Sequence, residues 1–130
     1  MATSDHTVAG LDLPAVSDEF MRERLAQTQT YTLVMLSKTA RYKRPDADPI
    51  VWEHGRRNFM LREAGLMPIV CPIRDDSGWA GICILTVEPE RASEIMSEDP
   101  GVTAGIFDYQ VHPIVGFPGS SLPNADQAIP

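Results

Sequence analysis

The sequence predicts an α+β protein with the ferredoxin-like fold, in which an antiparallel sheet of four strands carries helices on one face. Three observations predict it. Between residues 30 and 116, short β-branched runs typical of strands alternate with segments that have the spacing of amphipathic helices. These segments follow one another as β-α-β-β-α-β, the order of that fold. A chain of 130 residues, 43% apolar and 22% charged, also has the size and composition of one globular domain.

The two ends of the chain differ from its middle. Residues 1–14 are small and polar, and we expect them to be a mobile arm. An extra N-terminal helix follows, because Ser17 can cap it and the next apolar side chains recur at helical spacing. Residues 117–130 are rich in Pro, Gly, Ser and Asn, which indicates an extended tail. The single domain then spans residues 15–116.

The first half of the domain predicts a strand, a loop and a long helix. Residues 30–39 are β-branched and apolar without a helical stripe, so they predict a strand sheltered on both faces. After a charged loop over residues 40–48, Asp48 is a good N-cap and the fixed φ of Pro49 suits the first helical position. Gly65 is the residue type expected just past the end of that helix.

The second half predicts two strands, a helix and a final strand. Residues 67–73 predict an edge strand because they contain two prolines, and after the turn DDSG residues 78–87 predict a more continuous strand. Pro89 opens a helix that we expect to end near Asp99. The stretch SEDPGVTAG predicts a short turn or a single helical turn, and residues 106–115 predict the last strand.

A sheet with helices on one face leaves its other face bare. Such a face needs cover, and pairing with a second copy about a two-fold axis is the usual solution. We therefore expect a homodimer or a higher oligomer.

Charge and composition exclude several classes of partner. The net charge of −7 argues against nucleic acid, because phosphate binding needs clustered Lys and Arg. No apolar run approaches the roughly 18 residues that span a bilayer. The first ten residues lack the basic start and apolar stretch of a secretory signal. We expect a cytoplasmic protein that binds neither nucleic acid nor a membrane.

The sequence indicates neither a metal site nor a cofactor. Structural zinc needs four closely spaced ligands, and no such spacing occurs. No glycine-rich phosphate loop follows a predicted strand. Cys71 and Cys83 are separated by twelve positions around the DDSG turn, which would place them on one face of neighbouring strands. A cytoplasmic setting favours two free thiols over a disulfide.

His54, in the predicted long helix, and Asp99, at the start of the DPG turn, are the candidate catalytic residues. Histidine titrates near neutral pH, and a carboxylate that accepts a hydrogen bond from one ring nitrogen leaves the other free to take a proton. Sequence separation alone does not bring the two residues together. An Asp before a Pro is also typical of a helix N-cap, so Asp99 can serve as a cap, as a catalytic partner or, with its two oxygens, as both.

Three further residues are candidates for substrate binding. Arg57 lies three residues after His54 and therefore on the same helix face, where it could present a cation to an anionic substrate. Arg44 could do the same, although a surface arginine is usually only solvated. His112 belongs to a row of polar side chains on alternate residues of the last strand. That row suits either a pocket or an exposed sheet face.

The stretch ICILTVEPERASEIMSEDPGVTAGIFDYQVHPI, together with the helix histidine, resembles the YCII-related family. The resemblance covers about residues 30–116, and its most specific part is the DPxxxAG pattern from Asp99 to Gly105, closed by HPI at the end of the last strand. It implies a ferredoxin-like fold that dimerises as an α/β barrel, with a pocket in which His54 and Asp99 meet. One branch of the family resembles a dehydrochlorinase that acts on a chlorinated hydroxyquinol. The family commonly has glycine where this chain has Cys71.

Three hypotheses for function follow. The first is a small cofactor-free enzyme, a lyase or isomerase, in which His54 acts as general base or acid, oriented by Asp99, on a small cyclic or aromatic compound. The second is a non-catalytic dimeric module that binds a small molecule or stabilises a partner, with Asp99 only a cap. The third is a cofactor-independent monooxygenase of the dimeric α/β barrel type, which rests on fold analogy. We favour the first.

Overall fold

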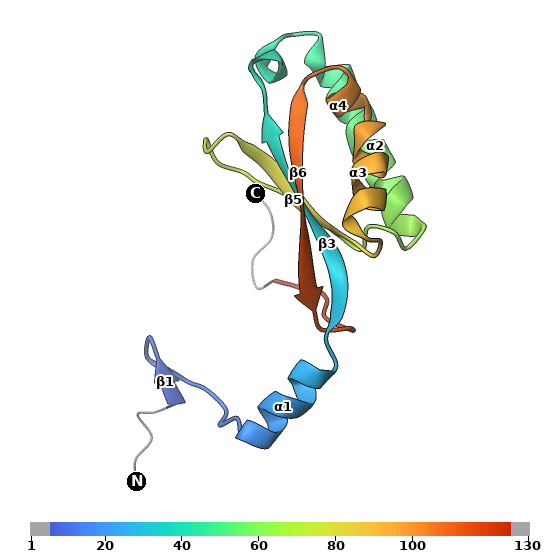
Figure 1. Ribbon diagram of the computed structural model, residues 1–130. Coiled ribbons are helices and arrows are strands. Elements are labelled where there is room, and N and C mark those ends of the chain that lie inside the picture. The colour runs from blue at the N-terminus through green and yellow to red at the C-terminus, as the bar shows by residue number, and fades with distance from the viewer. Residues whose placement is uncertain (1–5, 126–130) are drawn as a thin grey trace.

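The structure is a computed structural model that describes residues 6–125 (Figure 1). The outermost parts of the predicted arm, residues 1–5, and of the predicted tail, residues 126–130, lie outside the described residues. Two short strands and a helix precede a body in which strands and helices alternate. The elements are β1 (Thr7–Val8), β2 (Leu11–Asp12), α1 (Asp18–Ala26), β3 (Gln29–Lys38), the 3-10 helix η2 (Ala40–Lys43), α2 (Ala47–Glu63), β4 (Ile69–Pro72), β5 (Trp79–Leu85), α3 (Pro89–Ser97), α4 (Pro100–Thr103) and β6 (Phe107–Gly116).

The body is built on one open antiparallel sheet in the order β4-β5-β3-β6. The central strand β3 pairs along its whole length with β6, from Gln29 opposite Gly116 to Lys38 opposite Phe107, and with β5 on its other side. Strand β4, which follows Pro68 and ends with Pro72, is an edge strand as predicted. Helices α2, α3 and α4 all lie on the same side of the sheet (Figure 1). The α+β class with a four-stranded antiparallel sheet is therefore confirmed.

The residues of β3 show how the sheet divides into two faces. Thr32, Val34 and Leu36 are buried, whereas the residues between them are only half-buried. In the single chain β3 is sheltered on one face and not on both as predicted, because an antiparallel sheet with helices on one side buries alternate residues only. We call the side without helices the open face. Its residues, which follow from the strand register, include Tyr31, Leu33, Met35, Ile82, Ile84 and His112.

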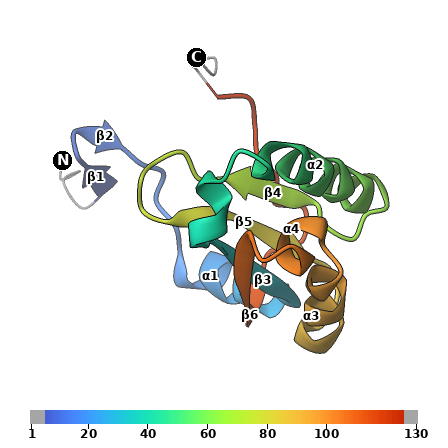
Figure 2. The same cartoon turned by 90° about the horizontal axis from the view of Figure 1, so that it is seen from above.

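The core fills the space between the helix side of the sheet and the helices (Figure 2). Leu85 of β5 and Met96 of α3 are among its fully buried side chains, together with Met67 from the loop before β4. Thr32 is buried but satisfied, because its hydroxyl donates to the backbone carbonyl of Val87 at 2.7 Å. Helix α2 contacts β4, whereas α3 packs on β3 and β6.

Helix α2 begins earlier than predicted. Its N-cap is Asp46, which makes no side-chain cap hydrogen bond, and its first residue is Ala47. Asp48 and Pro49 therefore lie within the first turn, where proline is tolerated because the first backbone N–H groups have no helical partner. Ala47 is 1% exposed, so packing of the first turn fixes the start of the helix. The predicted end is confirmed: Gly65 follows the helix with a φ of 78°.

The N-terminal helix α1 is confirmed, and the Ser17 hydroxyl accepts a hydrogen bond from the backbone N–H of Phe20 at 3.0 Å. None of its residues is buried, and it extends away from the sheet (Figure 1). Strands β1 and β2 form a small hairpin within the predicted arm, which the sequence did not predict. Ala9 and Gly10 join them, both with positive φ, as the tightest hairpin turns require.

Cys71 and Cys83 are both free thiols and lie on opposite faces of the sheet. The register pairs Cys71 with Ile82 and Val70 with Cys83. Successive residues of a strand point to opposite faces, so the prediction that the two thiols share one face is wrong. An offset of one residue in the pairing of β4 with β5 accounts for the difference. Within residues 6–125, the structure contains no helix with the length and apolar character that crossing a bilayer requires.

Replacing Gly81 should weaken the pairing of β4 with β5. A Cβ at this position would lie 2.8 Å from the backbone oxygen of Cys71 and 3.3 Å from the Cα of Pro72. These are backbone atoms, so Gly81→Ala should lower the free energy of unfolding by about 1–3 kcal/mol, measured by urea denaturation. Gly55→Ala is the contrasting variant, because a Cβ there meets nothing within 4 Å and that change should not lower the stability. An unchanged stability of Gly81→Ala would contradict this close approach.

Candidate active site

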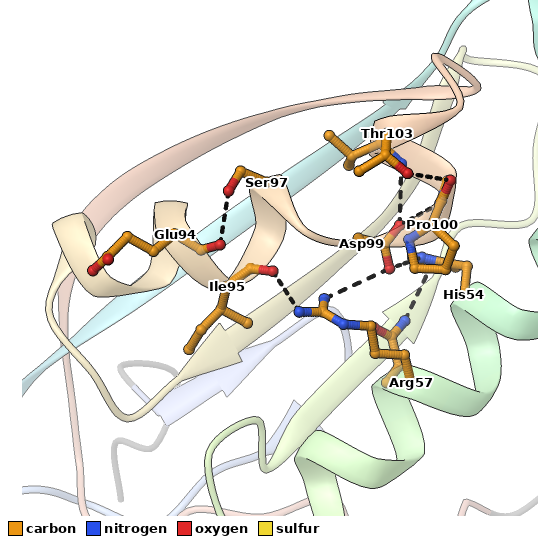
Figure 3. Close-up of polar contacts among 11 residues, drawn as sticks. His54, Arg57, Glu94, Ile95, Ser97, Asp99, Pro100 and Thr103 are labelled. Carbon is orange, nitrogen blue, oxygen red and sulfur yellow. Dashed lines mark hydrogen bonds and ion pairs between the residues drawn. The ribbon is translucent and has the colours of Figure 1, made fainter.

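His54 and Asp99 meet in the structure. His54 lies in the middle of α2, and Asp99 is the N-cap of α4. The ring nitrogen Nδ1 of His54 is 2.8 Å from Oδ1 of Asp99 (Figure 3). The Asp99 side chain is fully buried and that of His54 is 11% exposed. The structure therefore brings together two residues that lie 45 positions apart in the sequence.

Asp99 divides its two oxygens between two tasks. Oδ2 accepts hydrogen bonds from the backbone N–H groups of Gly101 at 2.9 Å and Val102 at 3.2 Å, which caps α4. Oδ1 faces His54. An ionised carboxylate can only accept hydrogen bonds, so Nδ1 of His54 donates and carries a proton. In the neutral ring, Nε2 then holds the lone pair that can take a proton.

Asn58 contacts the other ring nitrogen of His54. Its side-chain nitrogen Nδ2 lies 3.2 Å from Nε2 of His54, one helical turn further along α2. Because Nε2 is the acceptor, the Asn58 amide donates to it. The Asn58 oxygen is buried and has no hydrogen-bond partner among the described residues. The sequence did not predict this residue: its spacing of four places it on the same helix face as His54 but does not show that the two form a hydrogen bond.

Arg57 faces the carboxylate of the pair. Its Nη1 lies 3.9 Å from Oδ1 of Asp99, and its Nη2 donates to the backbone carbonyl of Ile95 at 2.7 Å. Figure 3 shows the guanidinium group reaching from α2 toward Asp99 and the end of α3. Arg57 does not line the cavity described below. In the single chain it therefore compensates the buried charge of Asp99 and ties α2 to α3.

The other two predicted binding residues lie elsewhere. Arg44 is exposed and forms an ion pair with Asp46 at 3.8 Å, just before α2. His112 is exposed on the open face, where its Nε2 is 3.2 Å from the side-chain oxygen of Gln110. Neither residue lines the cavity beside His54. The polar row on β6 thus belongs to the open face rather than to this site.

A cavity of about 780 Å³ lies beside His54, between α2 and strands β3, β4 and β5. This volume is within the range of sites that hold small molecules. Lys38, His54, Asn58 and Arg62 are its charged or strongly polar lining side chains, together with Ser120 and Ser121 of the C-terminal segment. Most of the remaining wall is apolar and includes Val34, Val51, Phe59, Val70, Met96 and Phe107.

Phe107 fixes the His54 ring from the sheet side. The two ring centroids are 4.8 Å apart and the ring planes are tilted by 50°. The DPG turn allows this arrangement, because a side chain at Gly101 would overlap the Phe107 ring. The described residues contain no group of three or more His, Cys, Asp or Glu side chains placed to hold a metal ion. The chemistry that the visible geometry offers is proton transfer at His54 in a largely apolar cavity.

Cys83 lines the same cavity, and its thiol should be unreactive in the folded protein. Burial, assisted by the charge of Asp99 and by Cys71, raises the pKa of the Cys83 thiol to about 12. The thiolate is the reactive form, so we expect no alkylation of Cys83 in the Cys71→Ser chain at about pH 8, and full alkylation in urea. Mass spectrometry measures both. Alkylation of the folded chain under the same conditions would contradict this description of Cys83.

The raised pKa of Cys83 also makes the free energy of unfolding depend on pH. The Cys83 pKa lies above the ordinary value of 9.0, so the neutral thiol favours the folded chain. This stabilisation is complete below the ordinary value and is lost as the pH rises toward 12. Cys83→Ala should remove that part of the pH dependence.

Compared with protein-family models and with curated proteins, the chain matches none.

Proposed function

We propose that the protein is a small enzyme in which His54 and Asp99 carry out general acid-base chemistry on a small apolar molecule, by elimination or isomerisation. The observation that carries this proposal is the 2.8 Å contact between Nδ1 of His54 and the buried carboxylate, next to a cavity of about 780 Å³. A cap needs only the oxygen that faces Gly101 and Val102. The second oxygen orients an imidazole, which is the arrangement that general bases use.

Asp99 sets the direction of proton transfer. With Nδ1 protonated, Nε2 takes a proton from a carbon of the substrate. In an elimination, the electrons of that C–H bond form the new double bond while the leaving group departs with its electron pair. The carboxylate stabilises the resulting imidazolium, which returns its proton to water. In an isomerisation, His54 returns the proton to another carbon of the same molecule.

The contact of Asn58 with Nε2 supports the alternative hypothesis, a module that binds a small molecule without catalysis. The Asn58 amide occupies the hydrogen-bonding position at Nε2 that a base needs. A module that only binds small molecules would keep this contact, with His54 as a wall of the cavity. The enzyme requires the substrate to take the place of the amide at Nε2. A measurement of proton transfer therefore distinguishes the enzyme from the non-catalytic module.

We further propose that two copies pair through their open faces, as the resemblance to dimeric α/β barrels of the YCII-related family implies. The central strand presents Leu33 and Met35 on this face, and β5 presents Ile82 and Ile84 beside them. All four are half-buried in the single chain. An apolar face of this kind is the usual basis of a two-fold interface.

Asp99→Asn should separate the cap from the base. The asparagine oxygen can still accept from both backbone N–H groups, but its NH₂ group would face Nδ1 of His54 and force the proton onto Nε2. We expect the rate of hydrogen-deuterium exchange at substrate carbons to fall by about 10²–10⁴, while the fold persists. The measurement is NMR in D₂O with cyclic enones, lactones and halogenated phenols.

Two variants complete this experiment. Asp99→Ser keeps a capping oxygen and loses the contact with His54, so it should be as inactive as Asp99→Asn. Glu53→Gln, next to His54 on the exposed side of α2, is the matched control and should exchange at the normal rate. Full exchange by Asp99→Asn would remove the pair from the mechanism.

The proposed dimer predicts that a charge on the open face separates the copies. Leu33→Asp places a carboxylate in the middle of that face, and sedimentation equilibrium should show a monomer where the natural chain is a dimer. Glu90→Lys on α3, an exposed change of charge on the helix side, should leave the dimer intact. A monomeric natural chain, or a dimeric Leu33→Asp chain, would rule out this interface.

A further inference from the structure

The cavity beside His54 has a charge pattern opposite to that of the whole chain. The net charge of the protein is −7. Among the described residues that line the cavity, however, Lys38 and Arg62 carry full positive charges, and none is Asp or Glu. Asp99 lies behind His54 and does not line the cavity. The site therefore offers positive charge within a mostly apolar wall.

Lys38 is the cation of this wall that forms no ion pair among the described residues. It is the last residue of β3, and its ammonium group lies 4.9 Å from the centroid of the Tyr42 ring. Asp75 is near enough that Lys38 helps to lower its pKa, after the larger effect of hydrogen bonds from Ser77, but the two form no ion pair. Arg62, by contrast, forms an ion pair in which its Nη1 lies 3.6 Å from Oε2 of Glu63.

Gly55 leaves open space at the same cavity. It lies in the interior of α2, directly after His54, and its φ is not positive. A Cβ built there meets nothing within 4 Å, so no close packing in the single chain requires glycine. Glycine inside a helix is less favourable than alanine by about 1 kcal/mol. Helix α2 thus carries a destabilising residue where it borders the cavity, and the packing of the single chain does not require that residue.

We propose that the substrate is a small apolar anion, whose flat apolar part lies against Gly55 and whose anionic group pairs with Lys38. This inference rests on the proposed function of the site and adds the substrate class to it. An ion pair is stronger beside apolar walls than in open water, so Lys38 selects an anion over a neutral molecule of the same shape. A side chain at position 55 would occupy the space that the apolar part needs.

The charge preference can be tested with two probes of one shape, 2-naphthoate and 2-naphthamide. Binding to the full-length protein is measured by NMR titration, with the backbone signals of residues 38 and 55 locating the ligand. We expect naphthoate to bind about tenfold more tightly than naphthamide, and Lys38→Gln to reduce this ratio to about one. Lys38→Arg should retain the preference. Lys43→Gln, which changes a lysine outside the cavity, is the matched control and should not alter it.

Gly55→Ala tests the space with two effects of opposite sign. The melting temperature should rise by a few degrees, because alanine favours the helix. The affinity for naphthoate should fall by about tenfold, and Gly55→Leu should abolish binding. A lower melting temperature would show that the fold itself needs this glycine. Unchanged affinity would show that the ligand does not lie against it.

The outcomes distinguish this inference from the proposed function. Equal binding of naphthamide and naphthoate, or an unchanged ratio in Lys38→Gln, would overturn the anionic substrate class, even with Asp99-dependent proton exchange intact. Loss of the dyad mechanism would leave the binding preference standing, because both probes are measured without turnover.

Discussion

The buried carboxylate of Asp99 is the group on which the site depends. A charge without water contact is costly unless hydrogen bonds and opposite charges surround it. Asp99 meets this requirement with two backbone N–H groups of its own turn, the ring N–H of His54 and the guanidinium of Arg57 at 3.9 Å. These partners come from α4 and α2. Satisfying one carboxylate therefore fixes two helices against each other and sets the tautomer of the histidine.

The DPG turn combines three requirements in three successive residues. Asp99 supplies the carboxylate, Pro100 begins the short helix with a φ that suits its first position, and Gly101 leaves room for the Phe107 ring. Phe107 in turn packs against His54. The capping role and the orienting role of Asp99 are thus one structure, because the turn that holds the cap also places the ring.

Much of the fold could be predicted from local pattern, whereas the site needed contacts that pattern does not contain. Ser17, Gly65 and Pro89 marked helix ends correctly, because capping chemistry acts within a few residues. The predicted start of α2 was wrong because burial of Ala47 decides where the helix begins, and burial is a tertiary property. The prediction that the two cysteines share a face was wrong because a register offset of one residue moves every side chain of a strand to the other face of the sheet.

The candidate site could be predicted only in part, because local sequence pattern does not contain tertiary contacts. His54 and Asp99 could be named as a pair, but only the packing of α2 on α4 brings them together. Arg57 lies on the helix face of His54 as predicted, yet its guanidinium group meets Asp99 rather than the cavity. Asn58 was missed since an amide on a helix is uninformative until its hydrogen-bond partner is known.

The placement of the two residues also has a consequence for biosynthesis. His54 belongs to the half of the chain that ends with β4, and Asp99 to the half that begins with β5. Among the described residues, the central strand β3 pairs with β5 and β6, which both belong to that later half. A nascent chain that has emerged from the ribosome as far as β4 has made the histidine and has neither its carboxylate nor its sheet. The contact between His54 and Asp99 therefore forms late in synthesis, when the part of the chain from β5 onward joins the part that ends with β4.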